Sequence, residues 1–391
     1  METGHLYLQN TFSAQALTFN YSPSMLRIFF VLLLLLHGLI RLMGFVKAFG
    51  LASVAQLSGQ ISRPAGVLWL AAALLFVASA LLFLLKKEGW WMAGAAALLL
   101  SQVLIFSQWR DAKFGSIANL IVLIGVVISF GRWQFNGMVR SELEVFYPVR
   151  TPEKKVIDTK MVATLPEPVQ KWLLRSGCIG KEIPQRVHLL QKGEMRTEPD
   201  GAWMPVQAEQ YFRVDEPGFL WIAKVQAAPF VQLDGRDKYM DGRGHMLIRL
   251  LSLFPVADAK GPATDQGTML RFLAETCWFP GAALNDYIRW EPVDSVSAMA
   301  VMHYGGVEAS GVFRFSPEGD LLAFDAMRYY DRKGGATLEK WHIANMQDSY
   351  RSFDGVRVPT RSEVSWLLEA GDFVWFKLEV SDIQYDEKLS L

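Results

Sequence analysis

The residues of this chain that could take part in chemistry gather on a short apolar segment in its second half. The segment LLSLFPVADAKGPATDQGTMLRFLAETCWFP, residues 250–280, begins like a buried strand and resumes as a helix over about residues 268–279. Asp258 and Asp265 lie in the loop predicted between the two. A few polar groups on an apolar frame indicate a ligand-binding site.

The predicted helix places three side chains suited to ligand binding on one face. At about 100° per residue, Arg271, Glu275 and Trp278 fall together, opposite an apolar face. An arginine fork suits a carboxylate or phosphate, and we expect Trp278 to lie beside the apolar part of the same ligand. The pattern indicates a lid helix whose polar face selects the ligand.

A purely structural interpretation of the same helix is also open. Arg271 and Glu275 are spaced i, i+4 and would form an ion pair worth a few tenths of a kcal/mol. Asp265 would cap the helix, and Trp278 would pack against the sheet. Arg249, Arg328 and Tyr330, on predicted neighbouring strands, are weaker candidates for the same pocket, with outward polar positions as the alternative.

Catalytic motifs are absent from the sequence. It contains no G-x-S-x-G elbow, H-E-x-x-H helix, P-loop or G-x-G-x-x-G turn. The run DGRDKYMDGRGH, residues 234–245, lacks calcium-loop spacing, and two Asp-Gly turns account for its acids. We therefore predict no catalytic residue, metal or cofactor. A hydrolase or transferase that uses Asp258, Asp265, Glu275 or His245 as acid and base, and a non-catalytic scaffold, remain as alternatives.

The second half of the chain shows the period of two that is typical of strands. Short apolar runs separated by turn signals such as EPDG, DGRG and RKGG predict about eleven or twelve strands, with one helix before them and one inserted. Because a twisted sheet of more than about ten strands seldom stays flat, we expect an α+β domain with a strongly curved, half-barrel-like antiparallel sheet.

The first half reads as membrane-spanning helices. About 20 apolar residues in a helix cross the hydrocarbon core of a bilayer. Four segments have this character, and they are residues 26–46, 66–85, 89–109 and 114–131. We predict an N-terminal tail (1–25), a four-helix transmembrane region (26–133), a linker (134–160) and the β domain (161–391).

Charge divides along the same boundary. Residues 1–150 carry 11 Lys or Arg against 5 Asp or Glu, whereas residues 151–391 carry 28 against 34. An acidic second half without a basic run argues against nucleic acid as a partner. Five Lys or Arg flank the predicted helices on each side, so the positive-inside rule does not decide the orientation.

Two further features of the sequence have alternative interpretations. His37 and Arg41 share a face of the first apolar helix, either as a functional pair with Gln102, Gln108 or Asp111, or as a packing histidine and an arginine that reaches the interface. The two cysteines, Cys178 and Cys277, are either buried thiols or a single disulfide.

Three blocks of sequence carry a family resemblance. KGEMRTEPDGAWMPVQAEQYF, DGRGHMLIRLLSLFPVADAKGPATDQGTMLRFLAETCWFP and RYYDRKGGATLEKW resemble an uncharacterised bacterial domain family of membrane-linked proteins, over about residues 160–388. That family has no assigned activity. The order of elements also resembles the half-barrel of bacterial lipoprotein carriers, which implies acyl chains held beneath helical lids outside the cytoplasmic membrane.

Together these observations predict a multi-pass protein of the bacterial cytoplasmic membrane. Its partners would be the bilayer and a lipid or other amphipathic molecule, bound by the C-terminal domain. The carrier-like order of elements and an N-terminal tail without Lys or Arg before Arg27 favour an extracytoplasmic C-terminal domain.

Overall fold

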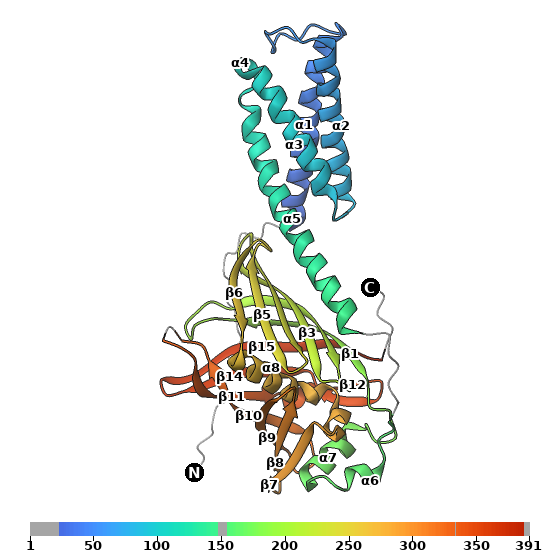
Figure 1. Cartoon of the computed structure of the whole chain (residues 1–391), viewed down its shortest axis with the longest axis vertical. Coiled ribbons are helices and arrows are strands. Elements are labelled where there is room, and N and C mark those ends of the chain that lie inside the picture. The colour runs from blue at the N-terminus through green and yellow to red at the C-terminus, as the bar shows by residue number, and fades with distance from the viewer. Residues whose placement is uncertain (1–22, 148–154, 333, 387–391) are drawn as a thin grey trace, which may run out of the picture. The chain divides into compact units, whose positions relative to one another are not determined.

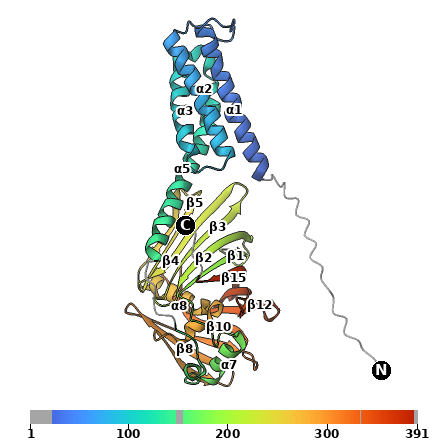
Figure 2. The same ribbon diagram turned by 90° about the vertical axis from the view of Figure 1, so that its right-hand side faces the viewer.

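The computed structural model describes residues 23–147, 155–332 and 334–386. The chain divides into two compact units at residues 130 and 131. Figures 1 and 2 show a helical unit and a β-rich unit. The expected N-terminal tail lies almost entirely outside the described residues.

The first unit consists of apolar helices. They are α1 (Pro23–Ala48), α2 (Arg63–Leu84), α3 (Trp90–Ser107), the short α4 (Trp109–Ala112) and α5 (Gly115–Phe146), which continues into the second unit. Four of them are long and apolar enough to cross a membrane, as predicted. Small residues let the helices approach closely, since a side chain at Gly44 would collide with the ring of Trp69.

A buried polar cluster lies inside this helical unit. His37 Nε2 is 2.9 Å from Asn119 Oδ1 and 3.0 Å from Arg41 Nη2, and Asn119 donates to Gln102. Arg41 is only 2% exposed and lies over the ring of Trp69. Of the partners predicted for Arg41 and His37, Gln102 joins the cluster, whereas Asp111 accepts hydrogen bonds from Ser58 instead.

The second unit contains two helices, a sheet and an inserted helix. Its helices are α6 (Thr159–Val162), α7 (Glu167–Ser176) and α8 (Pro262–Glu275), with 3-10 turns at Thr276–Trp278, Pro280–Leu284 and Gln347–Ser349. Its strands are β1 (Arg186–Met195), β2 (Met204–Arg213), β3 (Gly218–Ala228), β4 (Val231–Met240), β5 (Arg243–Leu250), β6 (Phe254–Lys260), β7 (Ile288–Asp294), β8 (Ser297–Tyr304), β9 (Val307–Phe315), β10 (Leu321–Tyr330), β11 (Thr337–Asn345), β12 (Tyr350–Phe353), β13 (Val356–Pro359), β14 (Arg361–Leu368) and β15 (Gly371–Tyr385).

Thirteen strands form one antiparallel sheet in the order β6-β5-β4-β3-β2-β1-β15-β14-β11-β10-β9-β8-β7. The last strand, β15, pairs with the first, β1, so two meanders join at the middle of the sheet. The separate β12-β13 ribbon completes the strands. The curved half-barrel predicted from the sequence is confirmed, with slightly more strands than expected.

Helix α8 lies inside the curve of the sheet (Figure 1). It contacts β4, β5 and β6 in one arm and β8, β9 and β10 in the other. Phe272 packs against Phe212 of β2 and Tyr239 of β4, which makes one continuous core of helix and sheet. A covering helix of this kind buries the apolar inner face of a curled sheet.

The tips of two hairpins meet and join the arms of the half-barrel. The β4–β5 turn at Asp241 and Gly242 and the β8–β9 turn at Gly305 and Gly306 have positive φ at both central residues, which is the geometry of a two-residue hairpin. A Cβ atom on Gly242 would lie 2.8 Å from Gly305 Cα. The backbones can touch here because neither residue has a side chain.

The end of α5 packs on the outer face of the sheet. The side chains of Phe135, Val139 and Leu143 cluster with those of Tyr211 and Leu220. Tyr211 of β2 pairs with Leu220 of β3, next to the pair of core residues Phe212 and Phe219. Because side chains alternate along a strand, Tyr211 and Leu220 lie on the opposite, outer face of the sheet. We predicted a linker over residues 134–160, but its first part, residues 134–146, is the end of α5. The part of that segment between 148 and 154 lies outside the described residues.

Candidate functional site

A row of inward-facing residues crosses the strands that face α8. The strand register places Gln210 of β2 opposite Trp221 of β3, Trp221 opposite Asp237 of β4, and Asp237 opposite Met246 of β5. Because side chains alternate along a strand, residues paired in this way share one face of the sheet. The row thus presents an amide, an indole, a carboxylate and a thioether to the helix.

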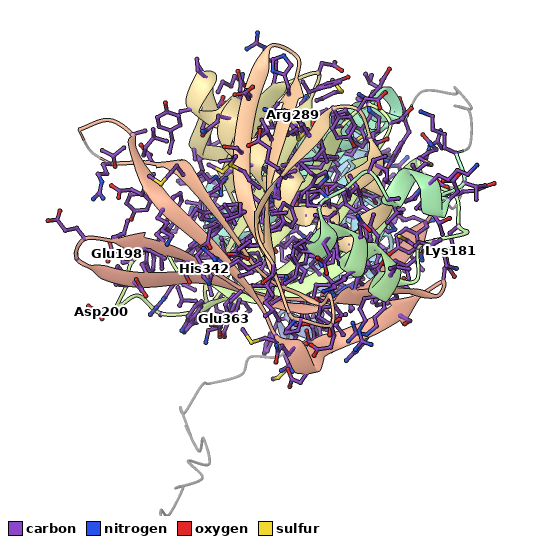
Figure 3. All side chains as sticks on the ribbon, turned by 90° about the horizontal axis from the view of Figure 1, so that it is seen from below. Lys181, Glu198, Asp200, Arg289, His342 and Glu363 are labelled. Carbon is purple, nitrogen blue, oxygen red and sulfur yellow. The ribbon has the colours of Figure 1, made fainter. Side chains whose placement is uncertain are left out.

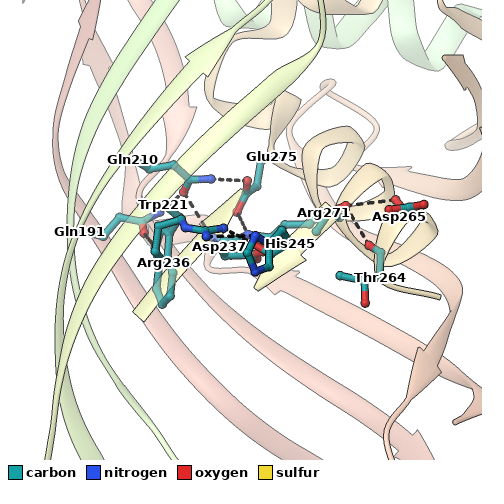
Figure 4. A network of polar contacts seen from close by, with 11 residues as sticks. Gln191, Gln210, Trp221, Arg236, Asp237, His245, Thr264, Asp265, Arg271 and Glu275 are labelled. Atoms are coloured by element: carbon teal, nitrogen blue, oxygen red, sulfur yellow. Dashed lines mark hydrogen bonds and ion pairs between the residues drawn. The ribbon is translucent and has the colours of Figure 1, made fainter. Parts of the chain in front are cut away.

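Arg271 of α8 is the centre of a buried network built on this row (Figure 4). Its Nη1 donates to Asp237 Oδ2 and its Nε to Glu275 Oε1, both at 2.8 Å. The guanidinium also lies 4.8 Å from the ring centroids of Phe219 and Trp221. Two carboxylates and two aromatic faces therefore surround a single cation.

Two glutamines extend the network along β1 and β2. Gln210 Nε2 donates to Glu275 Oε2 at 2.7 Å, and Gln191 Nε2 lies 3.3 Å from Gln210 Oε1. Trp221 Nε1 donates to Gln191 Oε1 at 2.8 Å. These bonds fix both oxygens of Glu275 and hold the indole of Trp221 in place.

Burial and charge oppose each other in this network. Burial raises the pKa of Glu275, and hydrogen bonds from Arg271 and Gln210 only partly offset the effect. For Arg271, burial opposes the charge, but the adjacent Glu275 and Asp237 raise its pKa. The guanidinium stays charged and both acids are directed toward it, so the arginine has little attraction left for another anion.

A cavity of about 210 Å³ lies between α8 and the sheet. Its wall includes four tryptophans, three methionines and several aliphatic side chains, drawn from both meanders. Methionine and tryptophan fit irregular apolar ligands well. The tryptophans are Trp221, Trp278, Trp341 and Trp375, and the methionines are Met195, Met204 and Met246.

Arg328 of β10 also lines this cavity. Its guanidinium carbon lies 4.6 Å from the ring centroid of Trp341 and 5.9 Å from that of Trp366. Within residues 23–147, 155–332 and 334–386, its side chain makes no hydrogen bond or ion pair. Burial lowers the pKa of Arg328 to about 10, so the group is charged at neutral pH.

Apart from the two aspartates, the predicted site residues lie in three different settings. Arg271, Glu275, Trp278 and Arg328 line the cavity. Tyr330 lies on the same face of β10 and packs against Trp366, outside the cavity lining. Met246 and Ile248 of β5 line the cavity. Because side chains alternate along a strand, the side chain of Arg249, the next residue, lies on the opposite face of the sheet.

The two predicted aspartates belong to neither a loop nor the cavity. Asp258 lies on β6 and accepts a hydrogen bond from His245 Nε2 at 2.7 Å. His245 contacts Arg236, which pairs with Glu142 of α5 on the outer face. Asp258 and Glu275 therefore share no pocket. A hydrolase or transferase mechanism that uses these two acids together would need them close to each other, and the structure does not place them so.

Asp265 is the fourth residue of α8 and does not cap its N-terminus. Its carboxylate accepts from the Gly244 amide at 2.7 Å and from Arg243 Nη1 at 2.9 Å, which ties the helix to β5. The expected Asp-Gly turn at Asp234 is also wrong, because Asp234 lies within β4. Its neighbour Asp237, assigned to a turn from sequence, is instead the partner of Arg271.

Sequence reasoning missed Gln191, Gln210, Asp237 and Trp341 as site residues. Inward alternation from Trp221 could have identified Gln210 and Asp237, but only with the strand register known. Cys178 and Cys277 are free and buried, as the simpler interpretation predicted. No group of three His, Cys, Asp or Glu in the described part of the chain is placed to hold a metal ion.

Comparisons with known proteins give a family and distant structural likenesses. Residues 155–378 match the model of a family of unknown function, DUF6544, which confirms the resemblance to an uncharacterised family. None of the curated proteins matches the chain. A crystal structure of a DUF1329 family protein from Desulfovibrio piger is similar at 14% identity and a TM-score of 0.33, over 57% of this chain and 96% of that one.

Proposed function

This chain belongs to DUF6544, a family of unknown function, and we propose that its C-terminal domain binds a lipid or another amphipathic molecule at the surface of a membrane. The observation that carries the proposal is the apolar cavity between α8 and the half-barrel. Protein interiors are normally packed to crystal density, so a cavity of this size between well-packed layers is typical of a ligand site.

The composition of the wall favours an acyl or similar chain. Four tryptophans and three methionines surround the space, while the polar atoms of the Arg271 network are largely satisfied by one another. A sugar or nucleotide would need many unpaired donors and acceptors on the wall. An apolar chain needs none, and its burial contributes roughly 25 cal/mol per Å² of apolar surface.

The helical unit supports a membrane setting for this binding. Four helices of the described chain are long and apolar enough to span a bilayer. A domain in the same chain would meet lipids at high local concentration. The cavity also favours ligand binding over the scaffold alternative, which predicts an exposed apolar patch without a cavity.

Native mass spectrometry of the full chain, purified in mild detergent, tests the proposal. We expect co-purifying lipid, or uptake of an offered acyl probe, as a discrete added mass. Repeated absence of both would overturn the proposal.

A matched pair of variants locates the bound mass. Ile248→Trp places an indole in the cavity and should abolish uptake, whereas Leu338→Trp, at an exposed position, should leave it unchanged. Equal uptake by both variants would show that the probe binds elsewhere, for example to the apolar helices.

We further propose that the protein lies in the bacterial cytoplasmic membrane with its C-terminal domain outside the cytoplasm. Four spans put the N-terminal tail and the β domain on one side, and the tail carries no Lys or Arg before Arg27. A reporter fused after Leu391 that is active only in the cytoplasm would reverse this assignment.

A further inference from the structure

We propose that the ligand of the cavity carries an anionic group, a carboxylate or a phosphate, and that Arg328 rather than Arg271 binds it. This inference rests on the proposed binding of an amphipathic molecule and specifies the class of that molecule.

Two of the arginines that line the cavity, Arg271 and Arg328, differ in how their charge is used. Arg271 is held by Asp237 and Glu275, each at 2.8 Å. Arg328 makes no hydrogen bond or ion pair with any described residue, although Asp237 and Glu275 attract it from a longer distance. Arg328 is half-buried, and a cation that is partly removed from water without a direct partner leaves its N–H groups available for a charge-assisted contact with a ligand anion.

The surroundings of Arg328 hold the guanidinium in place without neutralising it. Trp341 and Trp366 present ring faces to the cation, and such contacts orient an arginine while leaving its N–H groups free. Across from it, a Cβ atom on Gly267 of α8 would lie 3.2 Å from Arg328 Nε. The glycine thus leaves the space that the side chain occupies.

Two tryptophans that line the cavity have covered indole nitrogens without an acceptor among the described residues. These tryptophans are Trp341 and Trp375. One acceptor, Asp237 Oδ1, is likewise unpaired. The Asp237 carboxylate disfavours an anion nearby, so the preference for an anionic group comes from the Arg328 guanidinium, whose N–H groups can donate charge-assisted hydrogen bonds.

Binding of four probes to the full chain in amphipol tests the inference. The probes are decanoate, decyl phosphate, decanol and inorganic phosphate, each used below any micelle-forming concentration. We expect decanoate and decyl phosphate to bind about ten- to a hundredfold more tightly than decanol, the range that a charge-assisted contact supplies. Inorganic phosphate should bind far more weakly, because it buries no chain.

Variants assign the preference to one residue. Arg328→Gln should remove the preference for the anions and leave the affinity for decanol unchanged, which also shows that the cavity is intact. Arg328→Lys should keep part of the preference, since a point charge lacks the fork. Arg289→Gln is the control, because Arg289 lies on the surface of β7 (Figure 3).

Results other than those expected contradict either the role of Arg328 or the proposed function. Equal affinity of the wild type for decanol and decanoate, or an anion preference that survives Arg328→Gln, overturns the role of Arg328 but not the proposed function. Failure of every amphiphile to bind overturns the proposed function as well. Inorganic phosphate that binds as tightly as decyl phosphate would show a free-anion site and no role for a chain.

Discussion

Arg271 Nη1 and Asp237 Oδ2 lie 2.8 Å apart and form a buried ion pair that joins α8 to β4. The side chains are 16% and 8% exposed. A pair so placed differs in kind from the exposed i, i+4 pair expected from the sequence, because each partner has lost its hydration and depends on the other. The same holds for Glu275, whose side chain is 9% exposed.

Arg271→Met should therefore destabilise the fold by about 3–5 kcal/mol, since it leaves two buried carboxylates without their cation. Urea unfolding of the β domain in the full chain, followed by tryptophan fluorescence, measures the change. Arg289→Met is the matched control, because that side chain is 69% exposed, and it should change the free energy of unfolding by less than about 1 kcal/mol. A similarly small loss for Arg271→Met would show that the acids find other partners.

Asp265→Ala should cost about 1–3 kcal/mol, because the buried amide of Gly244 loses its acceptor. Asp265→Asn keeps an acceptor oxygen and should cost less. Arg243→Ala removes the second partner of Asp265, an arginine whose side chain is 70% exposed. This variant therefore measures the contribution of the exposed ion pair alone. If Arg243→Ala proves as damaging as Asp265→Ala, the exposed ion pair rather than the amide bond holds α8 to β5.

The stability of the β5–β6 edge should fall as the pH drops below about 6.5. Burial and the nearby Arg236 lower the pKa of His245 below its usual value of 6.5. As the pH falls, His245 is protonated in the unfolded chain before it is protonated in the folded chain. The contribution of His245 to the stability of the folded state is therefore complete above pH 6.5 and is lost below it. The hydrogen bond from His245 lowers the pKa of Asp258 below 3.8, and that contribution is lost only in stronger acid.

Amide hydrogen exchange along β6 between pH 7 and 5, corrected for the intrinsic rate, reports this loss. His245→Gln has no proton to take up in this range, so its protection should be the same at both ends. Protection of the wild type that does not change with pH would mean that His245 is not a determinant of this edge.

Local patterns in the sequence predicted the helices and strands better than the tertiary contacts between them. Apolar length identified the four long helices, and alternation with turn signals identified the half-barrel and the inserted helix. The polar network was not predictable, because Asp237 meets Arg271 through strand register and curvature rather than through spacing. The Arg271–Glu275 pair was predicted, since i, i+4 spacing is local, but its burial depends on the sheet that surrounds α8.

At the contact between the two hairpin tips, the effect of close backbone approach can be separated from that of backbone strain. Gly242 and Gly306 have nearly the same positive φ, 76° and 77°, so alanine at either position suffers similar strain, about 1–2 kcal/mol. A Cβ atom on Gly306 would meet nothing within 4 Å, whereas one on Gly242 would lie 2.8 Å from Gly305 Cα. Because backbone cannot move aside as a flexible side chain can, Gly242→Ala should also push the two arms of the half-barrel apart. We expect it to lower the free energy of unfolding more than Gly306→Ala does, and to increase amide exchange at both turns. Equal losses for the two variants would mean that the tips do not touch in solution.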